Sequence, residues 1–368
     1  MRILISNGTL RRRSGTECYA MDLGVGLRDR GHEIVFFSPR LGASAQELKA
    51  LGFQVTDCLS EIGTPPDLIH GQHTVPALRA ACAFPEAPLV YICHDALSPA
   101  DAPTPAFLTD QYAAVDHLTA RRIEEEVGVS RADVEIFGNV VDTTQFTCRV
   151  HFAESPRRAL IYSGSTRSVS HFEAIRSACA KIGLPLDEAG ERANGFFDHP
   201  EKLLPNYDIV FCKARCAMEA MATGAYVILI GDNGMGPAIN RSNVADLRLK
   251  NFGREALACD CTESYILSRI RAFDSEEAKE MAEWTHAYLS QKGWLDQVEA
   301  TYKALITVRA KRDLLRELPL GARLKYKDWR LRLDTKSQRL ECAQLSGAAK
   351  FIDRVSFQCG KLFRKHKK

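Results

Sequence analysis

The sequence lacks the long apolar runs that mark membrane-spanning or secreted chains. None of its 368 residues lies in an uncharged apolar stretch of about 18 residues, so no transmembrane helix is expected. The N-terminal segment MRILISNGTLRRR places its arginine run after a short apolar run, whereas a signal peptide carries its charges before one. We therefore expect the chain to act in the cytoplasm.

Motifs that would indicate a cofactor or a metal are missing as well. The dinucleotide fingerprint Gly-x-Gly-x-x-Gly does not follow the first apolar run, which argues against a dehydrogenase. No Asp-x-Asp motif stands at a strand end in the first half, and the closest cysteine pair, Cys259 and Cys261, has no partner pair at zinc spacing. Most of the twelve cysteines lie in apolar runs, which is typical of free thiols in a reducing compartment. We expect neither a bound metal nor a bound cofactor.

The chain does contain an ordinary globular composition and an alternating α/β pattern. Its 45% hydrophobic and 26% charged residues suit a soluble protein, and its length predicts two domains. In the first half, short apolar runs predict strands at residues 2–6, 33–38, 53–55, 67–70, 89–93 and 134–137. Helical stretches such as 17–30 and 121–127 lie between them, so we expect a parallel sheet covered on both faces.

The same pattern begins again after a polar segment without periodicity at residues 139–158. Strands are predicted at 158–163, 208–212 and 225–230, and helices at 171–182 and 217–223. The predicted organisation is a first domain at 1–150, a second at 151–290, a helix at 291–308 that crosses back, and a basic helical tail at 309–368. The fold class is therefore α/β, with two Rossmann-like parallel-sheet domains facing a cleft.

A small polar turn stands between the first predicted strand and the first predicted helix. Gly15 allows a ligand to approach the backbone closely, Thr16 can cap the helix, and Glu17 falls in the first turn. A helix N-terminus at a sheet edge presents free N–H groups to an anion or a sugar. The plain alternative is a tight turn with no ligand.

Several motifs together resemble a known family. The segments MRILISN, SGTECYAMDLGVGLRDRGHEIVFFSP, DLIHGQH, YICHD, VEIFGNVVDTTQF and EAMATGAYVIL occur in the order seen in GT-B fold glycosyltransferases. They look most like the retaining family-4 type, and the match spans about residues 1–308. The resemblance implies a nucleotide-sugar donor held mainly by the second domain and an acceptor held by the first.

The resemblance also implies roles for residues near the cleft. Gly15 and Thr16 match a loop near the donor phosphates, and His94 in YICHD matches a histidine that lines the reaction centre. The alternative for His94 is a histidine that caps a strand end at the edge of the core. In the second domain, the Arg and Lys with which the family grips the donor diphosphate are missing, and the segment YSGSTRSVSH offers Gly164 and, as its one cation, Arg167.

Glu219 in MEAMATG matches the carboxylate that accepts hydrogen bonds from the ribose hydroxyls, and it is expected to open a helix. The family's other glutamate, eight residues earlier, is replaced here by Phe211. Lys213 and Arg215 occupy the shortened loop CKAR between them, and we interpret them as the cations that neutralise the diphosphate. This departure leaves retaining or inverting stereochemistry open.

The last sixty residues differ in charge from the rest of the chain. Residues 309–368 contain 18 Lys or Arg and 6 Asp or Glu, a net charge of +12, with aromatic side chains interleaved. This composition fits an anionic membrane surface. The alternatives are a solvated or partner-binding tail and, least favoured because no nucleic-acid fold motif is visible, nucleic acid.

Together these features predict a metal-independent glycosyltransferase of the hexosyltransferase type, with no cofactor beyond its nucleotide-diphosphate sugar donor. Its acceptor is expected to be a glycan or a lipid-linked molecule. The alternatives are a nucleotide-sugar epimerase or hydrolase on the same fold, and a degenerate protein that binds sugar nucleotides without turning them over.

Overall fold

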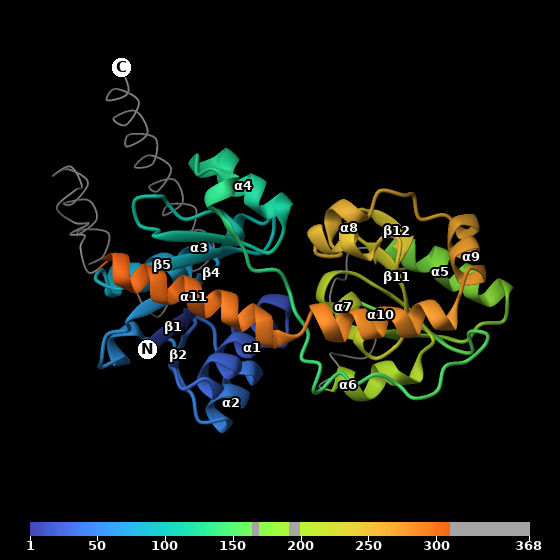
Figure 1. Ribbon diagram of the computed structural model, residues 1–368, viewed down its shortest axis with the longest axis horizontal. Coiled ribbons are helices and arrows are strands. Elements are labelled where there is room, and N and C mark those ends of the chain that lie inside the picture. Colours follow the sequence, from blue (N-terminus) through green and yellow to red (C-terminus); the bar gives the residue numbers. More distant parts are fainter. Residues whose placement is uncertain (164–168, 191–198, 310–368) are drawn as a thin grey trace, which may run out of the picture.

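A computed structural model describes residues 1–163, 169–190 and 199–309 (Figure 1). Two sheets, each flanked by helices, form an N-terminal unit and a C-terminal unit. Between them lies the polar segment in which the first predicted domain boundary, at residue 150, was placed. Gly164, Arg167 and the basic tail beyond residue 309 lie outside the described residues.

The N-terminal unit is built on a seven-stranded, all-parallel sheet in the order β3-β2-β1-β4-β5-β6-β7. The strands are β1 (Arg2–Ser6), β2 (Glu33–Phe37), β3 (Gln54–Thr56), β4 (Leu68–Gln72), β5 (Leu89–Cys93), β6 (Gln111–Ala114) and β7 (Glu135–Ile136). The helices are α1 (Gly15–Asp29), α2 (Ala43–Ala50), α3 (Thr74–Ala83) and α4 (His117–Val127). Two separate apolar clusters pack on the two faces of this sheet, as expected for buried parallel strands.

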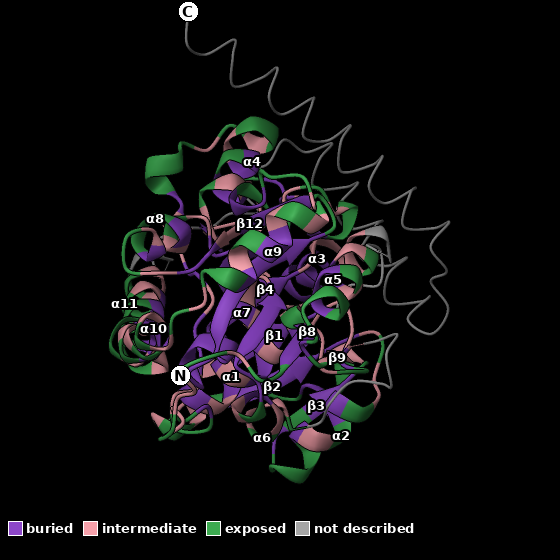
Figure 2. Ribbon diagram, turned by 90° about the vertical axis from the view of Figure 1, so that its right-hand side faces the viewer, coloured by how far each residue is buried: buried purple, intermediate pink, exposed green. Residues whose placement is uncertain are grey.

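The C-terminal unit has a five-stranded sheet in the order β12-β11-β10-β8-β9, in which only the pairing of β11 with β12 is antiparallel. The strands are β8 (Ala159–Tyr162), β9 (Leu186–Ala189), β10 (Ile209–Cys212), β11 (Tyr226–Gly231) and β12 (Gly234–Ala238). The helices are α5 (Val169–Lys181), α6 (Pro200–Leu203), α7 (Ala214–Ala222), α8 (Val244–Leu249), α9 (Glu263–Arg271) and α10 (Ser275–Tyr288), after which the chain continues into α11 (Gln291–Arg309). Buried strands lie behind exposed helix faces in Figure 2.

The predicted fold class is confirmed, and every predicted strand is present within two residues at each end. Three further strands were not predicted. The sequences of β9 (LDEA) and β12 (GMGPA) are polar or rich in Gly and Pro, because both strands lie at sheet edges. The third, β6 (QYAA), has small side chains in place of a strong apolar run.

The chain passes between the two units twice, and the two passages are joined by hydrogen bonding. Helix α10 belongs to the C-terminal unit, whereas α11 packs on the N-terminal unit through Trp294, Val298 and Tyr302 (Figure 1). In the other passage, the N–H of Val141 donates to the carbonyl of Leu289 at 3.0 Å. No helix in the described part of the chain is both long and apolar enough to span a bilayer.

Candidate functional site

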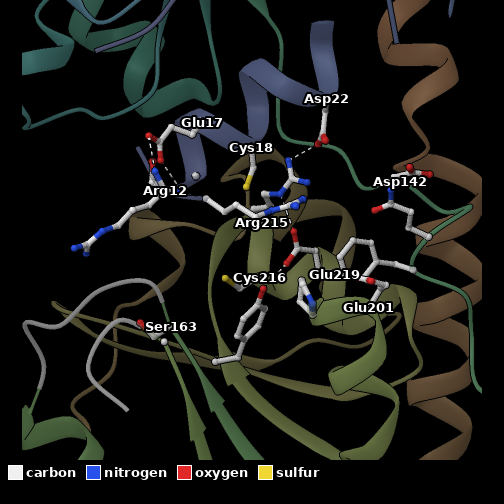
Figure 3. A pocket seen from close by; sticks show the side chains of 18 of the residues that line it. Arg12, Glu17, Cys18, Asp22, Asp142, Ser163, Glu201, Arg215, Cys216 and Glu219 are labelled. Carbon is white, nitrogen blue, oxygen red and sulfur yellow. Dashed lines mark hydrogen bonds and ion pairs between the residues drawn. The ribbon is translucent and has the colours of Figure 1, made fainter. Parts of the chain in front are cut away.

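A cavity of about 440 Å³ lies between the two units, and both of them line it (Figure 3). The N-terminal unit contributes the loop from β1 to α1, the first two turns of α1, and Arg40 after β2. The C-terminal unit contributes the end of β8, the start of α6 and the first two turns of α7. The cavity therefore lies at the carboxyl ends of β1 and β8, where open α/β sheets bind ligands.

Helix α1 begins at Gly15, and its N-cap is Ser14. The interpretation of Thr16 as the cap is therefore wrong, because the helix starts two residues earlier than predicted. Gly15 lines the cavity, and Thr16 is not among the lining residues. Glu17 is buried, and its carboxylate accepts hydrogen bonds from the backbone N–H groups of Arg11 at 2.6 Å and Ser14 at 2.9 Å. This carboxylate thus fixes the loop that leads into α1.

Sequence reasoning missed a group of arginines on the N-terminal side of the cavity. They are Arg11, Arg12, Arg13 and Arg40. The run RRR immediately before Ser14 was the available signal, but on its own a short basic run is indistinguishable from a solvated turn. The backbone of Arg40 accepts a hydrogen bond from Leu10, which holds the two arginine-bearing loops together.

On the opposite side, Glu219 lies within α7, with only 5% of its surface exposed. The expectation that it opens the helix is wrong, because α7 begins at Ala214 with Lys213 as its N-cap residue. The segment CKAR is thus not a loop but the end of β10 and the first turn of α7. One oxygen of Glu219 accepts from the Tyr162 hydroxyl at 2.8 Å, and the other accepts from Arg215 Nε at 2.7 Å.

Arg215 connects the two units across the cavity. Its Nη1 lies 2.6 Å from Oδ2 of Asp22 on α1, while its Nε contacts Glu219 on its own helix (Figure 3). Burial lowers the pKa of the guanidinium, but the carboxylates of Asp22 and Glu219 outweigh burial and raise it well above its usual value. Arg215 is therefore a permanent cation neutralised by two acids.

Lys213 and Arg215, which sequence reasoning placed together, lie in different surroundings. Lys213 is not among the residues that line the cavity, and its Nζ lies 3.8 Å from Asp232 after β11. The residue between them, Ala214, has φ of 51°, so the backbone turns sharply there. A joint role of the two cations at the diphosphate stays a prediction.

His94 follows β5 and lies among buried aromatic and histidine side chains, not among the lining residues of the cavity. Its ring packs edge-on against Tyr19 at 4.8 Å. Burial, together with the neighbouring His73 and His70, lowers the pKa of His94 well below its usual value, so the imidazole is neutral near pH 7. Its place in the reaction centre stays a prediction.

Two thiols from opposite units also line the cavity, Cys18 on α1 and Cys216 on α7 (Figure 3). Burial raises the pKa of Cys18 to about 11 and raises that of Cys216 further. Both are therefore protonated at neutral pH, which disfavours a nucleophilic role. Ten cysteines in the described ranges are free thiols, and the same ranges hold no group of three His, Cys, Asp or Glu side chains able to bind a metal ion.

Comparison with known proteins places this geometry in context. Residues 13–145 match the model of Glycosyltransferase Family 4. A crystal structure of HepE (Alr3699) from Anabaena, in complex with UDP and glucose, aligns with a TM-score of 0.61 at 14% identity, covering 82% of this chain and 99% of that one. A glycosyltransferase from Rickettsia africae aligns with a TM-score of 0.56 at 13% identity, covering 83% and 98% of the two chains.

A UDP-N-acetylglucosamine 2-epimerase assigned in Listeria monocytogenes is also similar, with a TM-score of 0.54 at 13% identity over 82% of this chain and 96% of that one. No curated protein matches by sequence. These likenesses confirm the GT-B fold and the resemblance of the N-terminal unit to family 4. At such low identities the structural likenesses establish the fold alone.

Proposed function

We propose that this chain, which has the GT-B fold, transfers a sugar from a nucleotide-diphosphate sugar to a glycan or lipid-linked acceptor. The observation that carries the proposal is the carboxylate of Glu219, which is held by Tyr162 and Arg215 inside a cavity shared by both units. A carboxylate with two acceptor oxygens suits the vicinal hydroxyls of a ribose. The glucose- and UDP-bound relative of the same fold supports this class of donor.

In the proposed reaction the protein contributes position and charge. The two units hold donor and acceptor on opposite sides of the cavity, so that the reacting atoms meet with little loss of freedom. Charge that develops on the leaving diphosphate is stabilised by the predicted cations, Lys213 and Arg215, and by the N–H groups at the start of α1. His94, which is not among the residues that line the cavity, is proposed to donate or accept one hydrogen bond through its neutral imidazole.

A second candidate function is epimerisation or hydrolysis of a nucleotide sugar, which the similar fold of the Listeria epimerase favours. A degenerate binding protein is the third, because Phe211 replaces the family's first glutamate and is fully buried. Product analysis separates them: an epimerase converts the nucleotide sugar without an acceptor, a transferase requires one, and a binding protein leaves it intact.

The proposal predicts that Glu219→Ala weakens nucleotide binding. Losing hydrogen bonds to a charged acceptor costs about 1.5 to 3 kcal/mol, so the dissociation constant for UDP, ADP or GDP should rise at least tenfold. Titration calorimetry on the full chain measures it. The matched control is Glu201→Ala, a cavity-lining glutamate whose carboxylate pairs with His199 and which should change the constant little. If wild type and Glu219→Ala bind the nucleotide with equal affinity, Glu219 is not the residue that binds the ribose.

We further propose that residues 309–368 bring the enzyme to an anionic membrane. The net charge of +12 supports this, since each basic residue near such a surface contributes on the order of 1 kcal/mol. Truncation after Val308 should abolish sedimentation with anionic vesicles, while neutral vesicles bind neither form. Added salt should weaken the interaction, because exposed charges are screened beyond about 8 Å at physiological ionic strength. Equal binding to both vesicle types would contradict the proposal.

A further inference from the structure

The two sides of the cavity differ in charge. The N-terminal side carries Arg11, Arg12, Arg13 and Arg40, which we call the arginine wall. Among the residues that the structure describes, the C-terminal side contributes the acids Glu201 and Glu219 and one arginine, Arg215, which is already paired with two carboxylates. We infer that the arginine wall binds a phosphate group of the acceptor. This inference rests on the proposed function and names the acceptor's chemical class.

The backbone that carries the wall is fixed before any ligand arrives. The carboxylate of Glu17 accepts hydrogen bonds from backbone N–H groups of the loop, including that of Arg12 at 3.2 Å. The carbonyl of Arg11 accepts a hydrogen bond from Ala43 at 3.0 Å, which ties the wall to the start of α2. A Cβ on Gly42 would lie 2.7 Å from the Cα of Arg11, so the two loops touch. Such preorganisation favours ligand binding because less freedom is lost.

Two guanidinium groups of the wall, those of Arg11 and Arg40, have no carboxylate partner among the residues that the structure describes. Arg13 pairs with Glu47 at 2.9 Å, and Arg40 donates to the neutral carbonyl of Gly8 at 3.2 Å. The guanidinium of Arg11 has no hydrogen-bond or ion-pair partner among the residues that the structure describes. Guanidinium groups bind phosphate with two parallel hydrogen bonds. Several of them at one site suit a doubly charged phosphate better than neutral sugar hydroxyls.

The position of the wall favours the acceptor over the donor as the source of this phosphate. Arg11, Arg12 and Arg40 are exposed at the edge of the cavity, whereas Glu219, the proposed ribose ligand, is buried. Figure 3 shows the Arg12 side chain extending away from Arg215 and Glu219. A donor diphosphate bonded to a ribose at Glu219 would lie next to Arg215, which contacts that carboxylate directly. A phosphate at the wall therefore belongs to the other substrate.

The test uses inorganic pyrophosphate and UDP as probes on the full chain, by calorimetry. The variant is Arg11→Gln combined with Arg40→Gln, and the control is Arg131→Gln, an exposed arginine outside the cavity that pairs with Glu124. We expect pyrophosphate to bind even when the protein is saturated with UDP. The double substitution should lower the affinity for pyrophosphate about tenfold or more and change the affinity for UDP less than about twofold. Background binding to the basic tail is common to all variants.

Three results would overturn the inference. Unchanged pyrophosphate affinity in the double variant would mean that the wall binds no phosphate. Displacement of pyrophosphate by UDP, or a parallel loss of UDP affinity, would assign the wall to the donor diphosphate. If the chain binds no nucleotide at all, the proposed function fails, yet comparing wild type with the double variant still decides whether the wall binds phosphate.

Discussion

Arg215→Ala should lower the free energy of unfolding by about 3 kcal/mol, because it leaves two partly or fully buried carboxylates without their cation. Asp22 and Glu219 have side-chain exposures of only 21% and 7%, so water compensates poorly for the lost ion pairs. Urea unfolding at pH 7 measures the change. The matched control is Arg241→Ala, whose partner is Glu280 and whose side chain is 72% exposed, and there the loss should stay within about 0.5 kcal/mol.

A neutral pair separates the lost cation from the lost packing. Asp22→Asn combined with Arg215→Gln removes one carboxylate together with the guanidinium, and Glu219 keeps its hydrogen bond from Tyr162. We expect this double variant to recover more than half of the loss. If Arg215→Ala is no more destabilising than Arg241→Ala, the contact between the two units is energetically unimportant.

On acidification, the free energy of unfolding should begin to fall at a pH well above that at which ordinary carboxylates titrate. Burial lowers the pKa of His70 to about 3, and burial followed by the charge of Arg40 lowers that of His73 to about 4. An unfolded chain protonates both near pH 6.5, so below that pH the unfolded state binds more protons and stability falls. Each of these histidines lowers the stability by about 1.4 kcal/mol per pH unit, or roughly 4 kcal/mol for the two at pH 5. His94, whose pKa is also lowered by burial, adds a similar share of about 2 kcal/mol.

Asp101 opposes part of this effect. Burial raises its pKa to about 6, so its stabilising protonation is present at low pH and is lost as the pH rises through 6. For the three histidines together, the expected net loss between pH 6.5 and pH 5 is therefore roughly 5 kcal/mol. Urea unfolding across this range measures it. His70→Gln should flatten the dependence by one histidine's share, whereas His151→Gln, at an exposed position, should not. A flat wild-type profile would mean that the histidines are protonated in the folded state.

The fold was predictable because local signals agree with tertiary structure along most of the chain. The apolar runs at β1 and β5 coincide with the strands to the residue, since a parallel strand buried on both faces is apolar throughout. Edge strands such as β9 have one partner and carry polar side chains, so no local signal marks them. Helix starts were predicted too late at both α1 and α7, because Gly15 is a weak helix former and Lys213 is not one of the preferred N-cap residues.

The candidate site was predictable only one residue at a time. Motif position identified Glu219 and Gly15 as cavity residues without any knowledge of their partners. The pairing of Arg215 with Asp22 joins segments far apart in the sequence, and nothing in either segment specifies it. Tyr162 was read as the end of a strand, although its hydroxyl orients Glu219. The arginine wall combines two loops that meet only once the sheet order places β2 beside β1.

The double passage of the chain between the two units limits how the cavity can open. A single linker would let one unit swing in any direction, but here Val141 of the first passage is hydrogen-bonded to Leu289 beside the second. Because the two passages are hydrogen-bonded to each other at this point, they form a hinge that restricts the two units to rotation about one axis. The units are thus expected to rotate toward and away from each other about that axis, and a proteolytic cut in either passage should leave them attached.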